Sequence, residues 1–129
     1  MKYFKDSEFK KDPAKVDQLV KDGIDRIRDL AGCKIFINVA WSDSGHSSNS
    51  YHYKGEAIDF HFEAGKLTLP EQFSCICAVR DFRGIGFYPW WNSPGWHIDV
   101  RAGSLFWLSP AAGKYVYTAD ALIKEMRRE

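Results

Sequence analysis

Two short segments of this chain alternate strictly between large apolar side chains and smaller or polar ones. Residues 57–62 read Ala-Ile-Asp-Phe-His-Phe, and residues 96–101 read Trp-His-Ile-Asp-Val-Arg. Successive side chains of a β-strand point to opposite faces of its sheet, so this alternation predicts two strands. Each strand needs other elements to cover its apolar face, while its second face presents Asp and His side chains.

Three other segments are predicted to form helices. The segment 12–32 begins with Asp-Pro and ends with Gly. This predicts a helix, because Asp caps free amide groups, Pro fits the first helical position and Gly suits a helix end. The segment 68–82 begins with Thr and Glu three residues apart, which is the spacing of a capping box. A terminal helix is expected over residues 119–127.

Further strands are expected where β-branched and aromatic residues gather. Residues 34–40 and 85–88 have this composition. Residues 105–108 and 115–118 are predicted to pair as a hairpin. Residues 41–49 are rich in Ser and also contain Asp, Gly and Asn, which predicts a polar loop.

Composition limits the class of protein and the class of partner. The 129 residues are typical of a single domain, expected to span residues 1–129, and a content of 45% hydrophobic and 16% aromatic residues allows a sizeable core. With 18 Lys and Arg against 17 Asp and Glu, the net charge is +1, which gives no field that would favour nucleic acid or an anionic membrane. No apolar run is long enough to predict a membrane span.

The cysteines and the N-terminus indicate where the chain is made. Cys33, Cys75 and Cys77 are an odd number and cannot all pair within one chain, so reduced thiols are expected. The first six residues are charged and lack the apolar run of a secretory signal. We therefore expect synthesis in the cytoplasm without a signal peptide, and a monomer.

His52, Asp59 and His97 form a candidate metal site. Six residues separate His52 from Asp59, and Gly55 between them lets the chain turn. Two imidazoles and one carboxylate satisfy zinc in a catalytic site and leave a fourth position for water, whose pKa zinc lowers to about 7. The alternative is that the three side chains serve separately, as a surface His, a hydrogen-bonded His and a charge at a strand edge.

The same residues carry a resemblance to a known family. Residues 50–59 read Ser-x-His-x-x-Gly-x-Ala-x-Asp, which resembles the motif of the zinc D-Ala-D-Ala carboxypeptidase family of peptidoglycan peptidases. Residues 85–89 and 96–101 are similar to the later half of its small, single-domain branch, and residues 3–9 resemble the opening of phage and prophage members. The resemblance covers most of residues 1–108.

The resemblance implies a fold, a cofactor and an activity. It implies an α+β fold in which helices flank a small antiparallel sheet, as in the hedgehog signalling domain. It also implies that His52, Asp59 and His97 bind zinc. The activity would be hydrolysis of peptide bonds in bacterial cell-wall stem peptides, either removing a terminal D-Ala or cutting within the stem, so the protein would act on the wall after release or delivery.

The chain departs from the family pattern at two places. Residues 40–45 lack the Arg that assists the substrate in many members, and Pro94 stands where several branches have an acidic general base. Arg101 could take the place of the missing Arg by stabilising a developing oxyanion, or could form an ordinary ion pair. Asp99 could act as the general base or could orient a ligand imidazole, and the sequence leaves both roles open.

Other polar and aromatic residues are weaker candidates. His61 shares the face of Asp59 and could act as a base or could simply face solvent. Loop residues Asp43 and His46 could line a cleft. Tyr88, Trp90 and Trp91 could form an aromatic platform for a sugar-peptide substrate. Alternatively, Tyr88 packs in the core and the two Trp form a mobile rim.

These observations predict a zinc peptidase acting on peptidoglycan. Two rival interpretations remain at this point. One is a zinc-containing wall-binding or protein-binding module of the same fold that has lost catalysis. The other is a structural component of a phage particle.

Overall fold

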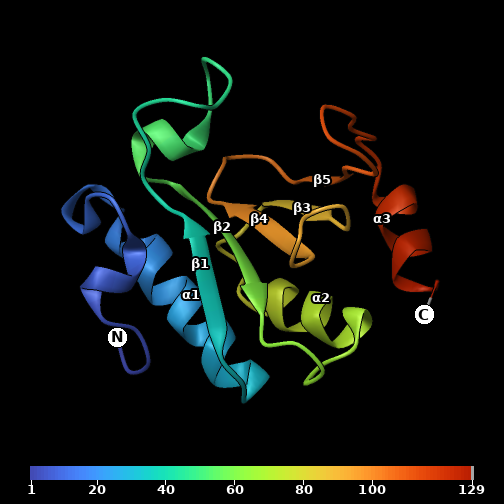
Figure 1. The fold of residues 1–129 in the computed structure, drawn as a ribbon, viewed down its shortest axis with the longest axis horizontal. Coiled ribbons are helices and arrows are strands. Elements are labelled where there is room, and N and C mark those ends of the chain that lie inside the picture. The colour runs from blue at the N-terminus through green and yellow to red at the C-terminus, as the bar shows by residue number, and fades with distance from the viewer. Residues whose placement is uncertain (129) are drawn as a thin grey trace.

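The computed structural model describes residues 1–128, and a five-stranded sheet forms the centre of this part of the chain (Figure 1). The strand order is β1-β2-β4-β3-β5, and every neighbouring pair is antiparallel except β3 and β5. The α+β class is therefore confirmed, but the sheet is mixed and not purely antiparallel as expected. The strands are β1 (Ile35–Val39), β2 (Ala57–Phe62), β3 (Gly84–Tyr88), β4 (Gly95–Asp99) and β5 (Leu105–Leu108).

Helices lie against one face of this sheet and beside one of its ends (Figure 1). The helix α1 contacts α2, and α3 packs beside β5 at the other end of the molecule (Figure 1). Within the described residues, no helix has the length and apolarity needed to cross a bilayer. The α-helices are α1 (Gln18–Ala31), α2 (Leu69–Cys77) and α3 (Ala119–Met126), and the short 3₁₀ helices are η1 (Asp6–Phe9), η2 (Pro13–Lys15) and η3 (Tyr51–Lys54).

The core lies between one face of the sheet and the helices α1 and α2. Apolar side chains from alternate positions of β2 and β4 share this core with those of the two helices. Full burial of each such side chain contributes about 1.5–3 kcal/mol, which fixes the orientation of both strands. The opposite face is thereby left to the intervening residues, including Asp59 and His97. The side chains of this part of the core are fully buried: Ile24, Ile27, Ile58, Phe60, Ile76, Trp96 and Ile98.

The first helix begins later than predicted. Asp12 and Pro13 start only the 3₁₀ turn η2, and the Asp12 side chain makes no capping hydrogen bond. Val16 is extended and buried, and the carboxylate of Asp17 accepts the Leu19 N–H to cap α1. Burial of Val16 therefore takes precedence over the local Asp-Pro signal.

Two other boundaries also differ from the prediction. The capping box at the start of α2 is confirmed, but the helix ends at Cys77 and not near Phe82. The Phe82 ring is buried against Gly23 of α1, where any larger residue would meet it. The hairpin predicted from β5 onward is reduced to one bridge between Leu108 and Val116, because β5 pairs in parallel with β3.

Gly55 is required where η3 meets the start of α1. Its φ is +70°, and its carbonyl accepts the Asp17 N–H at 2.9 Å. An alanine methyl group there would overlap the backbone carbonyl of Lys15. We expect Gly55→Ala to lower the free energy of unfolding by roughly 2–4 kcal/mol, measured by urea denaturation, since left-handed backbone alone costs about 1–2 kcal/mol.

Gly32 supplies the matched control for this substitution. Its φ is +66°, and no atom lies within 4 Å of the position where a Cβ would be. Gly32→Ala should therefore cost only the backbone contribution of about 1–2 kcal/mol. Equal losses in the two variants would show that the contact with Lys15 is unimportant.

Candidate metal centre

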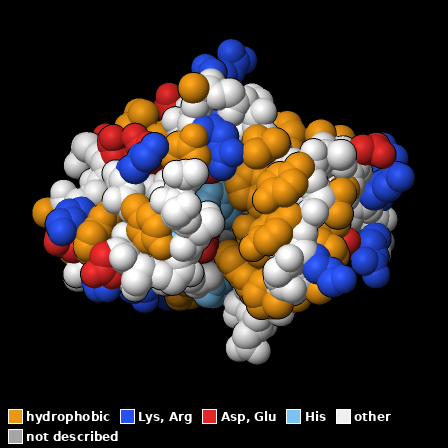
Figure 2. Space-filling model, turned by 90° about the horizontal axis from the view of Figure 1, so that it is seen from above, with side chains coloured by type: hydrophobic (Ala, Val, Ile, Leu, Met, Phe, Trp, Pro, Cys, Tyr) orange, Lys and Arg blue, Asp and Glu red, His pale blue; other side chains and the backbone are white. Residues whose placement is uncertain are grey.

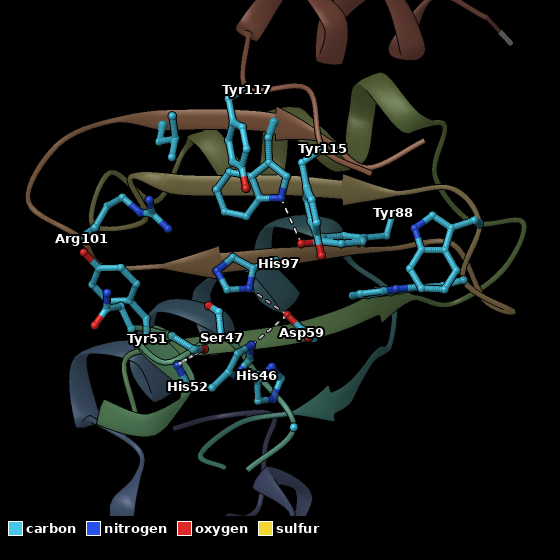
Figure 3. Close-up of a pocket in the computed structure, with 17 residues that line it drawn as sticks. His46, Ser47, Tyr51, His52, Asp59, Tyr88, His97, Arg101, Tyr115 and Tyr117 are labelled. Carbon is cyan, nitrogen blue, oxygen red and sulfur yellow. Dashed lines mark hydrogen bonds and ion pairs between the residues drawn. The ribbon is translucent and has the colours of Figure 1, made fainter. Parts of the chain in front are cut away.

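Three side chains meet on the polar face of the sheet (Figure 3). Asp59 Oδ1 lies 3.2 Å from His52 Nε2 and 2.9 Å from His97 Nδ1. The three candidate ligand atoms all lie within 4.8 Å of one another, so this buried or half-buried group could hold a metal ion. The predicted convergence of the three residues is confirmed, although the identity of the metal is not fixed by this grouping.

Local structure explains why these side chains meet. Asp59 of β2 and His97 of β4 are direct partners across the antiparallel pair, where opposite Cβ atoms lie about 4.5–5.5 Å apart. His52 comes from η3, which Ser50 caps by accepting the His52 N–H at 3.2 Å. Gly55 ends η3 and turns the chain directly into β2.

The second nitrogen of each imidazole has its own partner. His52 Nδ1 donates to the Ala40 carbonyl at 2.8 Å, so neutral His52 directs the lone pair of Nε2 at the Asp59 carboxylate. His97 Nε2 donates to Asp99 Oδ2 at 2.7 Å, and this bond turns His97 Nδ1 toward the Asp59 carboxylate. His52 Nε2, His97 Nδ1 and the Asp59 carboxylate are electron-rich atoms that face one another. A cation, or protons bound to these atoms, must stabilise this arrangement.

The donor set fits zinc. Two imidazole nitrogens and one carboxylate oxygen are usual zinc ligands, and bonds of about 2.0–2.1 Å in a tetrahedron place neighbouring ligand atoms roughly 3.3 Å apart. The contacts of 2.9 and 3.2 Å that Asp59 Oδ1 makes with the two imidazoles are close to that spacing. His52, Asp59 and His97 are therefore the residues that would hold the ion.

Buried charges shift the pKa values of these groups. Burial alone would lower the pKa of His97, but hydrogen bonds to Asp59 and Asp99 raise it to about 9. Burial would raise the pKa of Asp59, but its contacts with the His52 and His97 rings hold it well below its usual range. The pKa of Asp99 is likewise low despite burial, because Arg101 and His97 both donate to its carboxylate. Without a metal, the group at neutral pH is therefore two carboxylates with a protonated His97 between them.

A zinc ion held by this group would have to displace this proton, so its affinity would depend on pH. With a pKa of about 9, His97 is protonated at pH 7 in the metal-free protein, and the competition disappears only above pH 9. We expect release of about one proton per zinc at pH 7, and an affinity that rises about tenfold per pH unit toward pH 9. Calorimetry in buffers of different ionisation enthalpy measures this release. Binding that releases no proton would contradict the expected state of His97.

Asp99 lies behind His97 and holds it in place. The side chain is fully buried, and Gly84 on the neighbouring strand leaves the space that its carboxylate occupies. Asp99 Oδ2 accepts from His97 Nε2, and Arg101 donates to Oδ1 from Nε at 2.8 Å and to Oδ2 from Nη2 at 2.7 Å. Because both carboxylate oxygens already have donors, this geometry favours the orienting role over the role of general base.

Arg101 is fixed at one end of the site. Its guanidinium lies over the rings of Tyr51 and Trp107, with 4.8 and 5.3 Å to their centroids. The hydrogen bonds to Asp99 raise its pKa further. Arg101 therefore forms an ion pair with Asp99, which is one of the two roles predicted for it. This pair lies at the border of the metal centre.

A cleft of about 850 Å³ opens above the three candidate ligands. Figure 2 shows histidine side chains at the base of a groove, with a largely hydrophobic surface on one side. Tyr88, Trp90 and Trp91 line this cleft, so they are placed where a platform would require them, and the platform itself stays a prediction. The cleft volume lies within the range of about 300–1,000 Å³ that ligand-binding clefts have.

Four aromatic residues of the cleft were not identified from the sequence: Tyr51, Trp107, Tyr115 and Tyr117. Tyr115 and Tyr117 are 46% and 57% exposed, and their rings stack 5.9 Å apart. Their spacing of two is the signal that would place both on one face of an extended segment. The predicted hairpin concealed this signal, because it assigned the segment to sheet pairing.

Of the three weaker polar candidates, His46 lies in the cleft, whereas Asp43 and His61 lie outside it. His46 lines the cleft, and its ring stacks on His52 with centroids 4.3 Å apart. Asp43 lies outside the cleft in an exposed ion pair with Lys11. His61 is also outside, where its ring stacks on Phe36 and its Nδ1 bonds the side chain of Asn38.

Comparison of the chain with protein-family models and with curated proteins finds no significant match. The features that bear on function are then the converging ligands, the hydrogen bonds that orient them and the aromatic side of the cleft.

Proposed function

We propose that this protein is a zinc peptidase that hydrolyses peptide bonds in bacterial peptidoglycan stem peptides, in the manner of a phage endolysin. The observation that carries the proposal is the convergence of His52, Asp59 and His97 at the base of an open cleft. Three ligands of this type are the pattern of catalytic zinc, because four protein ligands would leave no position for reaction. The resemblance of residues 50–59 and 96–101 to the carboxypeptidase family supplies the substrate class.

In this proposal the metal activates water, and the residues of the centre hold the metal ligands in position. Zinc, when bound, lowers the pKa of water and polarises a carbonyl group. His52 and His97 are held in register by Ala40 and Asp99, so the ligand atoms do not have to reorganise during the reaction. Hydrolysis adds a water oxygen to the carbonyl carbon, breaks the C–N bond and moves a proton to the leaving amine. Asp99 stays a candidate carrier of that proton, although both of its oxygens already accept hydrogen bonds.

The shape of the cleft supports a peptide that continues on both sides of the cut bond. Arg101 and Tyr51 lie on one side of His97, and Tyr88 lies on the other (Figure 3). All of them line the same cleft as the three candidate ligands. A cut within the stem fits this arrangement as well as removal of a terminal residue does, so the reaction could release either product.

The direct test uses purified peptidoglycan fragments and the zinc-loaded protein. Mass spectrometry of the products should show a new amino group for each cleaved bond, and it should distinguish free D-Ala from a shortened stem. Removal of zinc with a chelator should stop the reaction, and added zinc should restore it. Full hydrolysis by a metal-free preparation, or no hydrolysis by the zinc-loaded protein, would overturn the proposal.

A binding module without catalysis is the second candidate. It is favoured by Pro94, which occupies the place of an acidic base, and by the lack of Arg in residues 40–45. Such a module would bind zinc and stem peptides but release no amine. Calorimetric binding of an intact stem peptide, measured together with amine release, separates the two functions.

A further inference from the structure

We infer that the Tyr88 hydroxyl donates a hydrogen bond to the carbonyl oxygen of the bond being cut, as negative charge develops on that oxygen. This inference rests on the proposed peptidase function and assigns a task that no metal ligand performs. Tyr88 ends β3, lines the cleft together with Asp59 and His97, and lies beside the metal centre in Figure 3.

The hydroxyl of Tyr88 has a proton to give. Among residues 1–128 it makes one hydrogen bond, with Trp107 Nε1 at 3.0 Å. The indole N–H can only donate, so the Tyr88 oxygen is the acceptor and its own proton is directed elsewhere. Since Tyr88 lines the cleft, a substrate oxygen beside the metal can receive this proton in a hydrogen bond.

Neighbouring rings hold this hydroxyl in position. Trp91 stacks on Tyr88 with centroids 4.4 Å apart and planes inclined by 14°. Tyr115 meets the ring edge-on at 6.4 Å. The indole of Trp107 fills the space left by the missing side chain of Gly86 on β3. A donor fixed in this way needs no reorganisation when charge appears on the substrate, which is the condition for strong oxyanion stabilisation.

Electrostatics keep Tyr88 in the protonated form. Burial raises the pKa of its hydroxyl, and the negative Asp59 nearby raises it further. Tyr88 is therefore a neutral donor at every pH at which the protein would work. The cleft also contains Arg101, but the Nε and Nη2 groups of that guanidinium already bind Asp99. Tyr115 and Tyr117 are about half exposed, so their hydroxyls are less well fixed.

Tyr88→Phe tests the inference, because it removes the hydroxyl and keeps the ring that stacks on Trp91. We expect kcat to fall about 100-fold to 1,000-fold, the magnitude for loss of one oxyanion donor, while KM changes less than about threefold. Zinc content should stay at the wild-type value. Tyr88→His, which restores an N–H donor on a ring, should recover part of the lost kcat.

Trp107→Phe is the control for a purely structural role. It removes the N–H that Tyr88 accepts and leaves the Tyr88 hydroxyl in place, so kcat should fall less than about tenfold. If Tyr88 served only as the acceptor for Trp107, the two Phe variants would lose the same activity. Equal losses, or a Tyr88→Phe kcat within threefold of wild type, would overturn the inference.

Binding of a phosphinate analogue of the stem peptide supplies a readout that needs no turnover. The analogue carries a tetrahedral anionic group in place of the scissile carbonyl, so its calorimetric Kd should weaken about 100-fold in Tyr88→Phe. Intact peptide should bind with an unchanged Kd. A wild-type protein that cleaves nothing would reject the peptidase function, whereas unchanged phosphinate binding in Tyr88→Phe beside an active wild type would reject only the role of Tyr88.

Discussion

Replacement of His52 with alanine should abolish both metal binding and hydrolysis of cell-wall fragments. His52 is buried, and its Nε2 lies 3.2 Å from Asp59 Oδ1 as one of the three candidate ligand atoms found among residues 1–128. Loss of a residue that merely orients a ligand costs about 10-fold to 100-fold in metal affinity, so loss of a ligand itself should cost more than about 100-fold. Zinc content after dialysis and amine release from stem peptides measure the two effects.

His61→Ala is the matched control for this substitution. His61 lies on the same strand as Asp59, but its ring packs on Phe36 outside the cleft. The variant should keep the zinc content and rate of the wild type, apart from any change in stability. A His52→Ala protein that retained zinc and full activity would show that the centre is not the site of reaction.

The alternation in residues 57–62 and 96–101 made the centre of the fold and the metal site predictable. Because side chains alternate across a sheet, burial of Ile58 and Ile98 forces Asp59 and His97 onto the other face. The spacing of His52 from Asp59 and the turn at Gly55 made His52 a candidate ligand, and the resemblance of residues 50–59 to the carboxypeptidase motif favoured it. These are local constraints, so they can be recognised in one sequence.

The remaining features depend on contacts between distant segments. The parallel pairing of β5 with β3 follows from the return of the chain beside β3, and the composition of residues 105–108 does not specify it. Tyr115 and Tyr117 were missed for the same reason, since the bridge between Leu108 and Val116 holds their segment beside β5. Alternation placed Asp99 on the correct face, but it could not show which atoms its carboxylate binds.

Asp99→Asn decides between the two roles that the sequence left open for Asp99. The substitution keeps the size of the side chain and removes the charge that binds Arg101 and orients His97. If Asp99 orients His97, zinc affinity should fall about 10-fold to 100-fold, and excess zinc should restore most of the activity. If Asp99 carries the proton, affinity should change little, while kcat at saturating zinc should fall about 100-fold to 10,000-fold.

We expect the first outcome, because both Asp99 oxygens already accept hydrogen bonds from His97 and Arg101 and the side chain is fully buried. A general base needs a lone pair within reach of the reacting water, and here the nearest groups to Asp99 are the donors that hold it. Asp43→Asn, an exposed change in the loop before η3, serves as the control and should leave zinc affinity unchanged. A large loss of kcat that excess zinc fails to restore would instead make Asp99 the proton carrier, and would require one of its hydrogen bonds to open when substrate binds.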